Sequence, residues 1–272
     1  LKVGWTCNHN CVHCVVSSKN ECSSKKNFSF DDIAAIVDRH VDCDKITVTG
    51  GEPFLRPDIA EIFSYIKRKN PSCQIEVQTN GTMLKDEPLV KESKKYVDCF
   101  FVALHSYRKA THDAICGRPG SWDDTIDGFV NLINNKCNIS TQTVISRLNM
   151  VDLVSTFDFF HDANLHDNWL TFPHPNGNAY TYFPIVVPRF SEIEPIIAEI
   201  TASHPNVNLA SIPACYLPSH GRYREYELNA YRPSGEKDIY CIELTNARPD
   251  HEPDEDFISQ IQREFNKNEN CS

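Results

Sequence analysis

The stretch Cys7–Cys14 reads CNHNCVHC, so three cysteines fall in one short loop, separated by three residues and then by two. A short apolar segment precedes this loop. Clusters of the [4Fe-4S] type take four cysteine thiolates when all four irons are held by the protein. Three thiolates leave one iron without a protein ligand, and such an iron can bind and reduce a small molecule. We therefore interpret Cys7, Cys11 and Cys14 as ligands of a cluster with one open iron.

A structural zinc loop is the alternative interpretation of the same residues. Zinc is held by thiolates and imidazoles at similar short spacings. His13, or otherwise His9, would complete a zinc site beside the three cysteines. In the cluster interpretation, His9 is expected to be a solvated loop residue. The cysteines alone leave both kinds of metal centre open.

A second segment follows about one βα unit later. Lys45–Thr49 reads as a short buried strand, and it runs directly into the turn GGEP at residues 50–53. Two glycines let a backbone come close to a ligand, and Glu52 adds a negative charge where the strand ends. This order predicts a ligand-binding turn at the carboxyl end of a strand.

Together, the cysteine spacing and this turn resemble the radical S-adenosylmethionine (SAM) superfamily. Its CxxxCxxC loop follows the first strand of the fold, and its GGEP segment follows the second. The resemblance implies two cofactors, a [4Fe-4S] cluster on the three cysteines and SAM beside it. It implies that His13, where the family usually has a carbocyclic aromatic residue, stacks on adenine. It also assigns the methionyl amino group of SAM to Gly50, Gly51, Glu52 and Pro53.

The length and the pattern of the chain predict an α/β fold. With 272 residues and 40% apolar residues, the chain can form one large domain and a small appendage. Amphipathic helices alternate with short apolar runs, which favours a parallel sheet with right-handed crossovers. Six such units are too few for a closed barrel, so we expect a partial (β/α)6 TIM-like barrel, as the resemblance also implies. The expected strands are 45–49, 74–79, 99–105, 139–145, 169–172 and 207–210. Helix N-caps are expected at Ser29, Asp58, Ser121 and Ser191.

Polar and glycine residues follow four successive expected strands. In a barrel, these positions meet at one rim, where ligands bind. The alternative is that each set has only a structural role, as a turn or as the cap of the next helix. By resemblance to the family pattern, contacts to the ribose, carboxylate and adenine of SAM fall to Gln78, Asn80, Ser106, Arg147, Asn149 and Gly177.

The stretch His112–Thr125 resembles a segment found in radical SAM enzymes that carry a SPASM or twitch-like C-terminal extension. Many of those enzymes modify ribosomal peptides. Physically, the stretch is a Gly/Pro turn that leads into a helix, so most of its residues are expected to be structural. Cys116 is a candidate hydrogen-atom donor to a substrate radical.

The C-terminal part is predicted to be separate from the barrel. We expect a radical SAM domain at residues 1–204 and an extension at 205–272, and we expect the sequence to be trimmed at both ends. By resemblance, Cys215 and Cys271 would hold an auxiliary iron-sulfur cluster. The alternative is that these cysteines are buried small apolar residues.

The resemblance implies an oxidoreductase or peptide maturase that cleaves SAM reductively and forms a 5′-deoxyadenosyl radical. The expected substrate is a peptide or protein segment that is epimerised, crosslinked or oxidised, and the expected electron donor is a reductant such as flavodoxin or ferredoxin. A small metabolite or cofactor precursor is the alternative substrate. The formal charge of −10 argues against nucleic acid as a partner. Reduced cysteines and the lack of an apolar run long enough for a bilayer predict a cytoplasmic protein without a membrane partner.

Overall fold

The main element of the structure is one parallel sheet. The structure, a computed structural model, describes residues 1–18, 27–212, 222–223, 229–231 and 237–239. Each strand of the seven-stranded sheet pairs with the next strand along the chain. This order is typical of barrel winding, because a doubly wound sheet reverses its strand order at a switch point. The strands are β1 (Lys45–Val48), β2 (Gln74–Thr79), β3 (Cys99–Ala103), β4 (Ile139–Val144), β5 (Asp167–Thr171), β6 (Asn208–Ala210) and β7 (Arg222–Tyr223).

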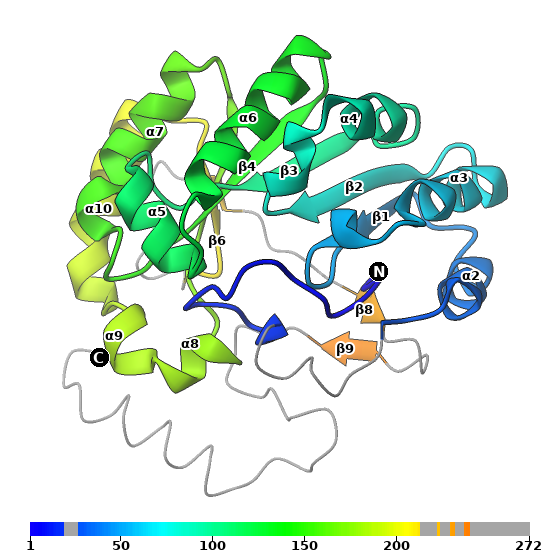
Figure 1. The fold of residues 1–272 in the computed structure, drawn as a ribbon. Helices are drawn as coiled ribbons and strands as arrows, with labels where there is room; N and C mark the ends of the chain where they lie inside the picture. Colours follow the sequence, from blue (N-terminus) through cyan, green and yellow to red (C-terminus); the bar gives the residue numbers. More distant parts are fainter. Residues whose placement is uncertain (19–26, 213–221, 224–228, 232–236, 240–272) are drawn as a thin grey trace, which may run out of the picture. The chain divides into compact units, whose positions relative to one another are not determined.

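Helices cover the outer side of this sheet, and Figure 1 shows α3, α4, α6, α7 and α10 in an arc around the strands. The α-helices are α2 (Phe30–Arg39), α3 (Ile59–Lys69), α4 (Glu87–Ser93), α5 (Lys109–Cys116), α6 (Ser121–Asn134), α7 (Leu153–Asp162), α8 (Asn178–Thr181), α9 (Phe183–Val186) and α10 (Phe190–Ser203). Short 3-10 helices are η1 (Pro53–Leu55), η2 (Thr82–Lys85) and η3 (Met150–Asp152).

The predicted partial barrel is confirmed, and strands β1 to β6 fall at the six expected places. The segment before the cysteine loop makes an isolated parallel bridge, from Lys2 to Thr49, instead of a full strand. Val3 N donates to Thr49 O at 2.9 Å, and Thr49 N donates to Leu1 O at 2.9 Å. Residues 1–3 therefore extend the sheet beyond β1 and deliver the cysteine loop to the carboxyl ends of the strands.

The core lies between the sheet and its helices. Alternate strand residues point to opposite faces of a sheet. Val77 of β2 and Phe100 of β3 are buried and belong to this core, where Phe100 stacks on Phe54 with ring centroids 6.2 Å apart. The next residue, Phe101, faces the other side and meets Trp169 of β5 edge-on at 5.9 Å.

Only one of the four predicted helix caps is formed as expected. Ser29 caps α2 in a reciprocal capping box with Asp32. Asp58 stands at the N-cap of α3, but its carboxylate pairs with Arg56 at 2.6 Å and makes no cap bond. Ser121 is the first residue of α6 and not its cap. Ser191 lies inside the first turn of α10, whose capping box joins the Arg189 backbone to a glutamate.

The chain divides into two compact units, Leu1–Glu225 and Tyr226–Ser272. The first unit contains the sheet. In the second, the described residues form the antiparallel pair β8 (Asn229–Tyr231) and β9 (Lys237–Ile239). The predicted division at residue 204 stays a prediction, and Cys215 and Cys271 lie outside the described residues.

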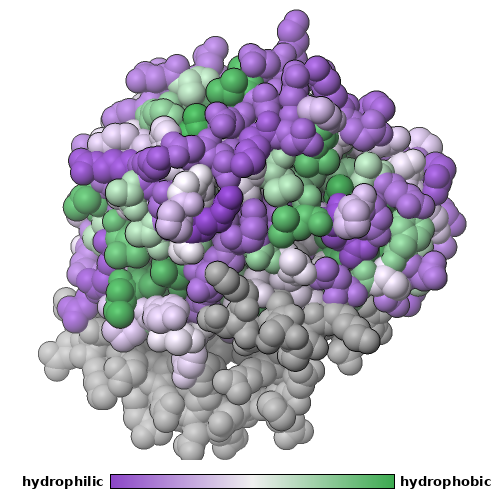
Figure 2. Space-filling model, in the orientation of Figure 1, coloured by the Kyte–Doolittle hydropathy of each residue, from purple (hydrophilic) through white to green (hydrophobic). Residues whose placement is uncertain are grey.

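Polar side chains cover most of the described residues on the face that Figure 2 shows. Figure 2 shows apolar patches among polar side chains, one of them over α9, where Ile185 is 62% exposed. Within the described part of the chain, no helix has the length and apolar character needed to cross a bilayer.

Candidate active site

The cysteine loop is anchored first by the GGEP turn. Gly51 N donates to Gly4 O at 2.9 Å, and Glu52 N donates to Thr6 O at 2.8 Å. A Cβ on Gly50 would lie 2.5 Å from Gly4 O, and one on Gly51 would collide with Thr6 O. Both glycines are therefore required by the close approach of residues 4–6, which lead into the loop.

Glu52 joins this turn to the end of β2. Its carboxylate is buried and accepts hydrogen bonds from Thr79 Oγ1 at 2.8 Å, from Asn80 N at 2.8 Å and from Phe54 N at 3.1 Å. Burial raises the pKa of the Glu52 carboxyl, and the three donors oppose that shift. Pro53 begins η1 directly after it. The carboxylate is thus engaged by the protein and fixes the geometry of the turn.

Asn80 links the end of β2 to the cysteine loop. Its Nδ2 donates to Asn8 Oδ1 at 2.8 Å and lies 4.0 Å from Cys7 Sγ. Asn8 in turn donates to Thr82 Oγ1 at 2.8 Å. Gln78 is half-buried in β2, and its side chain has no hydrogen-bond partner among the described residues. Of the predicted contacts from β2, Gln78 therefore retains a free amide, while Asn80 positions the first cysteine.

The C-terminal end of α5 holds the middle of the loop. Asn10 N donates to Cys116 O at 2.9 Å, and Val12 N donates to Ile115 O at 2.9 Å. Gly117 follows in the left-handed conformation with φ of +61°, and a Cβ there would lie 2.7 Å from Asn10 O. The Gly/Pro stretch that the sequence predicts to be structural thus supports the cysteine loop.

The same stretch also caps the next helix through a residue that the sequence analysis did not single out. The Asp113 carboxylate accepts hydrogen bonds from Gly120 N at 2.7 Å, Trp122 N at 2.8 Å and Ser121 Oγ at 2.9 Å. Asp113 therefore takes the capping role predicted for Ser121, because it projects from α5 onto the first turn of α6.

The segment after β5 holds the last part of the loop. Asn178 N donates to Cys14 O at 2.8 Å, and Asn178 Nδ2 donates to Cys11 O at 2.8 Å. Gly177 has φ of +56°, and a Cβ on it would lie 2.7 Å from Val15 O and even closer to Cys14 O. Gly177 therefore lies against the third cysteine, which gives a structural reason for a glycine at this position.

Three histidine rings lie in contact, one of them, His13, in the loop itself. His13 meets His105 edge-on with ring centroids 4.5 Å apart, and His105 stacks on His112 at 5.7 Å. Burial, with the neighbouring His112 second, lowers the pKa of His13 to about 4. Burial also lowers the pKa of His112 to about 4 and that of His105 well below its usual range. All three rings are therefore neutral at pH 7.

Three other predicted SAM contacts are engaged within the protein. Ser106 is buried, and its hydroxyl donates to Asp152 Oδ2 at 2.9 Å. Asn149 is buried and donates to His105 O at 2.7 Å. The Arg147 guanidinium lies 2.9 Å from the Glu192 carboxylate. In this arrangement, the three side chains shape the rim by fixing its loops.

The sulfur atoms of the loop suit an iron-sulfur cluster. Cys7 Sγ accepts a hydrogen bond from His9 N at 3.4 Å, and Cys14 Sγ lies 3.8 Å from Ser18 Oγ. Such contacts to the sulfurs are among the features that tune iron-sulfur clusters. Burial is the main reason that the pKa of the Cys7 thiol rises to about 12. A bound metal reverses this effect, because a coordinating thiol is deprotonated.

The zinc alternative predicted from these residues has no matching geometry. A tetrahedral ion with Zn–S bonds of about 2.3 Å requires ligand sulfurs only about 3.8 Å apart. In the described part of the chain, Cys7, Cys11 and Cys14 do not lie within 4.8 Å of one another, and His13 is turned toward His105. Among the described residues, the three loop cysteines are therefore not arranged as the ligands of one tetrahedral ion.

One feature near the loop differs from expectation. His9 is 2% exposed, so the prediction that it is solvated is wrong. Cys116 is 1% exposed and faces His112 and Cys11, so its candidate role as a hydrogen-atom donor stays a prediction. Asn8 and Asn178 were missed as loop supports, and Asp113 was missed as the cap of α6. Among them only Asp113 had a sequence signal, its place in the stretch His112–Thr125.

Comparison with known proteins identifies the family. The profile of the radical SAM superfamily matches residues 2–160. The AdoMet-dependent heme synthase of Methanosarcina barkeri is 29% identical over 175 residues, which are 64% of this chain and 49% of that protein. The antilisterial bacteriocin subtilosin biosynthesis protein AlbA of Bacillus subtilis is 31% identical over 122 residues, 44% of this chain and 26% of that protein.

Solved structures share the fold. SuiB of Streptococcus suis, bound to its precursor peptide SuiA, has a TM-score of 0.62 at 13% identity, covering 77% of this chain and 47% of that one. The enzyme anSMEcpe, with bound AdoMet and a Cp18Cys peptide, has a TM-score of 0.61 at 15% identity, covering 74% and 57%. The chain spans about half the length of the curated relatives it matches. Because the family profile covers more than half of the 272 residues and includes the whole cysteine loop, the chain belongs to the radical SAM superfamily.

Proposed function

We propose that this chain is a radical SAM enzyme that acts on a peptide or protein segment. The observation that carries the proposal is the placement of the cysteine loop. The GGEP turn, the end of β2, the end of α5 and the start of α8 all hydrogen-bond to the loop or to the residues that lead into it. Cys7, Cys11 and Cys14 would hold a [4Fe-4S] cluster at the carboxyl ends of the strands, where barrel enzymes bind their substrates.

When bound, the cluster and SAM supply a one-electron cleavage of SAM that allows hydrogen abstraction from an unactivated carbon. The residues of this chain position the reactants and limit the access of water. Gln78 offers a free amide, and the backbone of Gly50 and Gly51 offers polar groups to the methionyl end. Glu52 and Asn80 fix those groups indirectly. The neutral His13 ring offers a stacking face for adenine without repelling the positive charge of SAM.

The remaining predicted contacts act through the loops that they stabilise. Ser106 fixes the end of β3 through Asp152, and Asn149 fixes the end of β4 through the carbonyl of His105. Arg147 ties the same region to α10 through Glu192. We assign to these three side chains the role of positioning the SAM site. Gly177, which lies beside Cys14, has the same role.

A peptide substrate is supported by the likeness to AlbA, a bacteriocin biosynthesis protein, and by the fold shared with two peptide-bound structures. A small metabolite is the second candidate, because the heme synthase of Methanosarcina barkeri is 29% identical over a longer segment. The expected electron donor is a small redox protein such as flavodoxin or ferredoxin.

The cofactor assignment is tested by anaerobic reconstitution with iron and sulfide, followed by reduction and an assay for 5′-deoxyadenosine. We expect the wild-type chain to gain a brown cluster and to form 5′-deoxyadenosine. Cys14→Ala and Cys11→Ala should lose both properties. Cys137→Ala is the matched control, because this thiol lies after α6, away from the loop. A Cys14→Ala variant that still cleaves SAM would refute the assignment.

The substrate class is tested with the reconstituted enzyme and three kinds of probe. Short peptides encoded beside its gene are compared with a porphyrin and with GTP, and the rate of 5′-deoxyadenosine formation is measured for each. We expect only the peptides to raise this rate and to change in mass. Stimulation by the porphyrin or by GTP alone would support the small-metabolite alternative.

We also propose that residues 205–272 form an extension in which Cys215 and Cys271 hold an auxiliary iron-sulfur cluster. Its test is the iron content per chain. Cys215→Ala should lower the content without abolishing SAM cleavage, whereas an unchanged content would exclude an auxiliary cluster bound through this residue.

A further inference from the structure

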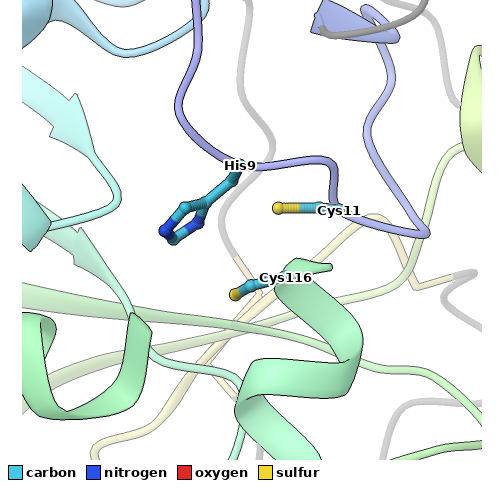
Figure 3. Close-up of side chains that lie close together, drawn as sticks. All are labelled: His9, Cys11 and Cys116. Atoms are coloured by element: carbon cyan, nitrogen blue, oxygen red, sulfur yellow. The ribbon is translucent and has the colours of Figure 1, made fainter. Parts of the chain in front are cut away.

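A second set of metal-binding side chains lies beside the cysteine loop. His9 and Cys11 come from the loop, and Cys116 comes from the last turn of α5 (Figure 3). One ligand atom from each residue lies within 4.8 Å of the other two. Among the described residues, this is the one group of three His, Cys, Asp or Glu side chains with that property.

His9 makes this group unusual. The ring is 2% exposed, and neither ring nitrogen makes a hydrogen bond of normal geometry with the described residues. A buried polar group without a partner costs about 1–3 kcal/mol, so protein folds seldom retain one without a reason. The ring lies beside the thiols of Cys11 and Cys116 (Figure 3). A metal ion between these atoms would satisfy a nitrogen of His9.

The contacts around the group hold it together. The backbone bonds from Asn10 and Val12 to α5 bring the loop against Cys116. His112 Nδ1 accepts a hydrogen bond from His105 N at 3.2 Å, so the proton of this neutral ring resides on Nε2. Nε2 lies 3.4 Å from Cys116 Sγ and can donate to it. An N–H donor of this kind orients a ligand atom and is typical of the surroundings of metal sites.

The donor set and the spacing fit one borderline-soft divalent ion. Two thiolates and an imidazole are typical zinc ligands, and a solvent molecule can take the fourth tetrahedral position. Ligand sulfurs around zinc are about 3.8 Å apart, so atoms within 4.8 Å need to approach by at most about 1 Å.

We propose that His9, Cys11 and Cys116 bind one divalent ion of the zinc class when the chain carries no iron-sulfur cluster. Binding replaces two thiol protons by two metal-sulfur bonds and releases both protons. Cys11 is shared with the ligand set of the proposed cluster, so the two metal centres exclude each other. The exclusion, but not the binding itself, rests on the proposed function.

The binding is tested with Co²⁺ on the full-length chain freed of iron under anaerobic conditions. We expect one Co²⁺ per chain, with near-ultraviolet absorption from thiolate charge transfer. Cys116→Ser and His9→Gln should each weaken binding by at least about tenfold, because they remove a ligand. The double variant Cys7→Ser/Cys14→Ser is the matched control and should bind as the wild type does.

Two outcomes would overturn the proposal. One is unchanged Co²⁺ affinity in Cys116→Ser. The other is loss of binding in the Cys7→Ser/Cys14→Ser control, which would place the ion on the three loop cysteines. Circular dichroism checks that the variants are folded. If Cys116→Ser is not folded, His9→Gln decides, and unchanged affinity in that variant overturns the proposal.

A second experiment tests the exclusion. Wild-type chain loaded with Zn²⁺ should take up less iron during reconstitution than metal-free chain, and Cys116→Ser should show no such difference. If the wild type takes up no iron in either state, the cluster assignment fails while the Co²⁺ result still stands. Equal iron uptake by the zinc-loaded and metal-free wild type would refute the exclusion.

Discussion

Gly177→Ala is expected to disturb the proposed cluster site without touching a ligand. Gly177 has φ of +56° and ψ of −129°, a combination that L-amino acids other than glycine rarely adopt. The added Cβ would lie 2.7 Å from Val15 O and closer still to Cys14 O. Since ordinary contacts begin at 3.4 Å, the end of the cysteine loop must move by at least 0.7 Å.

The size of the effect can be separated into two parts. Backbone strain at such a residue costs about 1–3 kcal/mol of stability. The displacement acts on function, because a shift of about 1 Å at a catalytic site can cost roughly 100-fold in rate. We therefore expect a modest fall in the free energy of unfolding and a fall of about 10- to 100-fold in 5′-deoxyadenosine formation.

Gly120→Ala is the matched control for strain alone. Gly120 has φ of +78°, and nothing lies within 4 Å of a Cβ placed there. Alanine in this left-handed position costs about 1–2 kcal/mol, without a collision. Urea unfolding, iron content and 5′-deoxyadenosine formation are measured for both variants. If Gly177→Ala keeps wild-type iron content and rate, the contact with Cys14 does not position the loop, and the reasoning is refuted.

Three further substitutions test the cap of α6 and the contacts that hold the GGEP turn and the cysteine loop. Asp113→Ala removes all three cap bonds of α6 and should lower the free energy of unfolding by about 2–3 kcal/mol. Asp113→Asn keeps one acceptor oxygen and should lower it by about 1 kcal/mol. Equal urea midpoints for the two variants would contradict the capping role of Asp113. Glu52→Gln turns an amide NH₂ toward a backbone or hydroxyl donor and should lower the free energy of unfolding by about 1–3 kcal/mol, measured by thermal unfolding. An unchanged stability would show that the carboxylate bonds are dispensable. Asn178→Ala frees the Cys11 carbonyl and should speed the loss of iron to a chelator, measured by absorbance, while an unchanged loss rate would exclude this contact as a support.

The barrel was predictable because its signals are local. Strands β1 to β6 alternate in the sequence with amphipathic helices, and each strand falls at its expected place. The capping box of α2 also needs only two residues three positions apart, Ser29 and Asp32. Alternation of such elements restricts the topology to few choices, which is why the fold followed from the pattern.

The other caps were not predictable because tertiary contacts replaced them. Asp58 has a suitable side chain for an N-cap, yet Arg56 two residues earlier captures its carboxylate. Ser121 was expected to cap α6, but Asp113 reaches the same backbone donors from the preceding helix. Sequence spacing shows which residues can cap a helix, and it does not show which competing charge lies nearby.

The candidate site also has a part that was predictable from the sequence and a part that was not. The spacing of Cys7, Cys11 and Cys14 is a short-range signal, and it pointed to the ligands at once. The groups that hold the loop come from far along the chain, since Asn80 bonds Asn8 across 72 positions and Asn178 bonds the Cys11 carbonyl across 167. No single-sequence pattern reports such pairs. His9 was misjudged for the same reason, because its buried ring lies beside Cys116 of α5, far along the chain.

The loop itself explains why so many rim residues serve as supports. From Cys7 to Cys14 the chain has no helix or strand, so its backbone polar groups must find partners elsewhere. Backbone carbonyls of α5, and the backbone and side-chain N–H groups of Asn178, supply them. Asn80 adds a bond to the side chain of Asn8. The loop has one backbone turn bond of its own, from Cys14 N to Cys11 O at 3.1 Å, so it is stable only if several other elements bind it at once. Only then are its thiols held for a metal centre. Substitutions at these supports should therefore weaken metal retention in proportion to the loop contacts they remove, even though none of them contacts the metal.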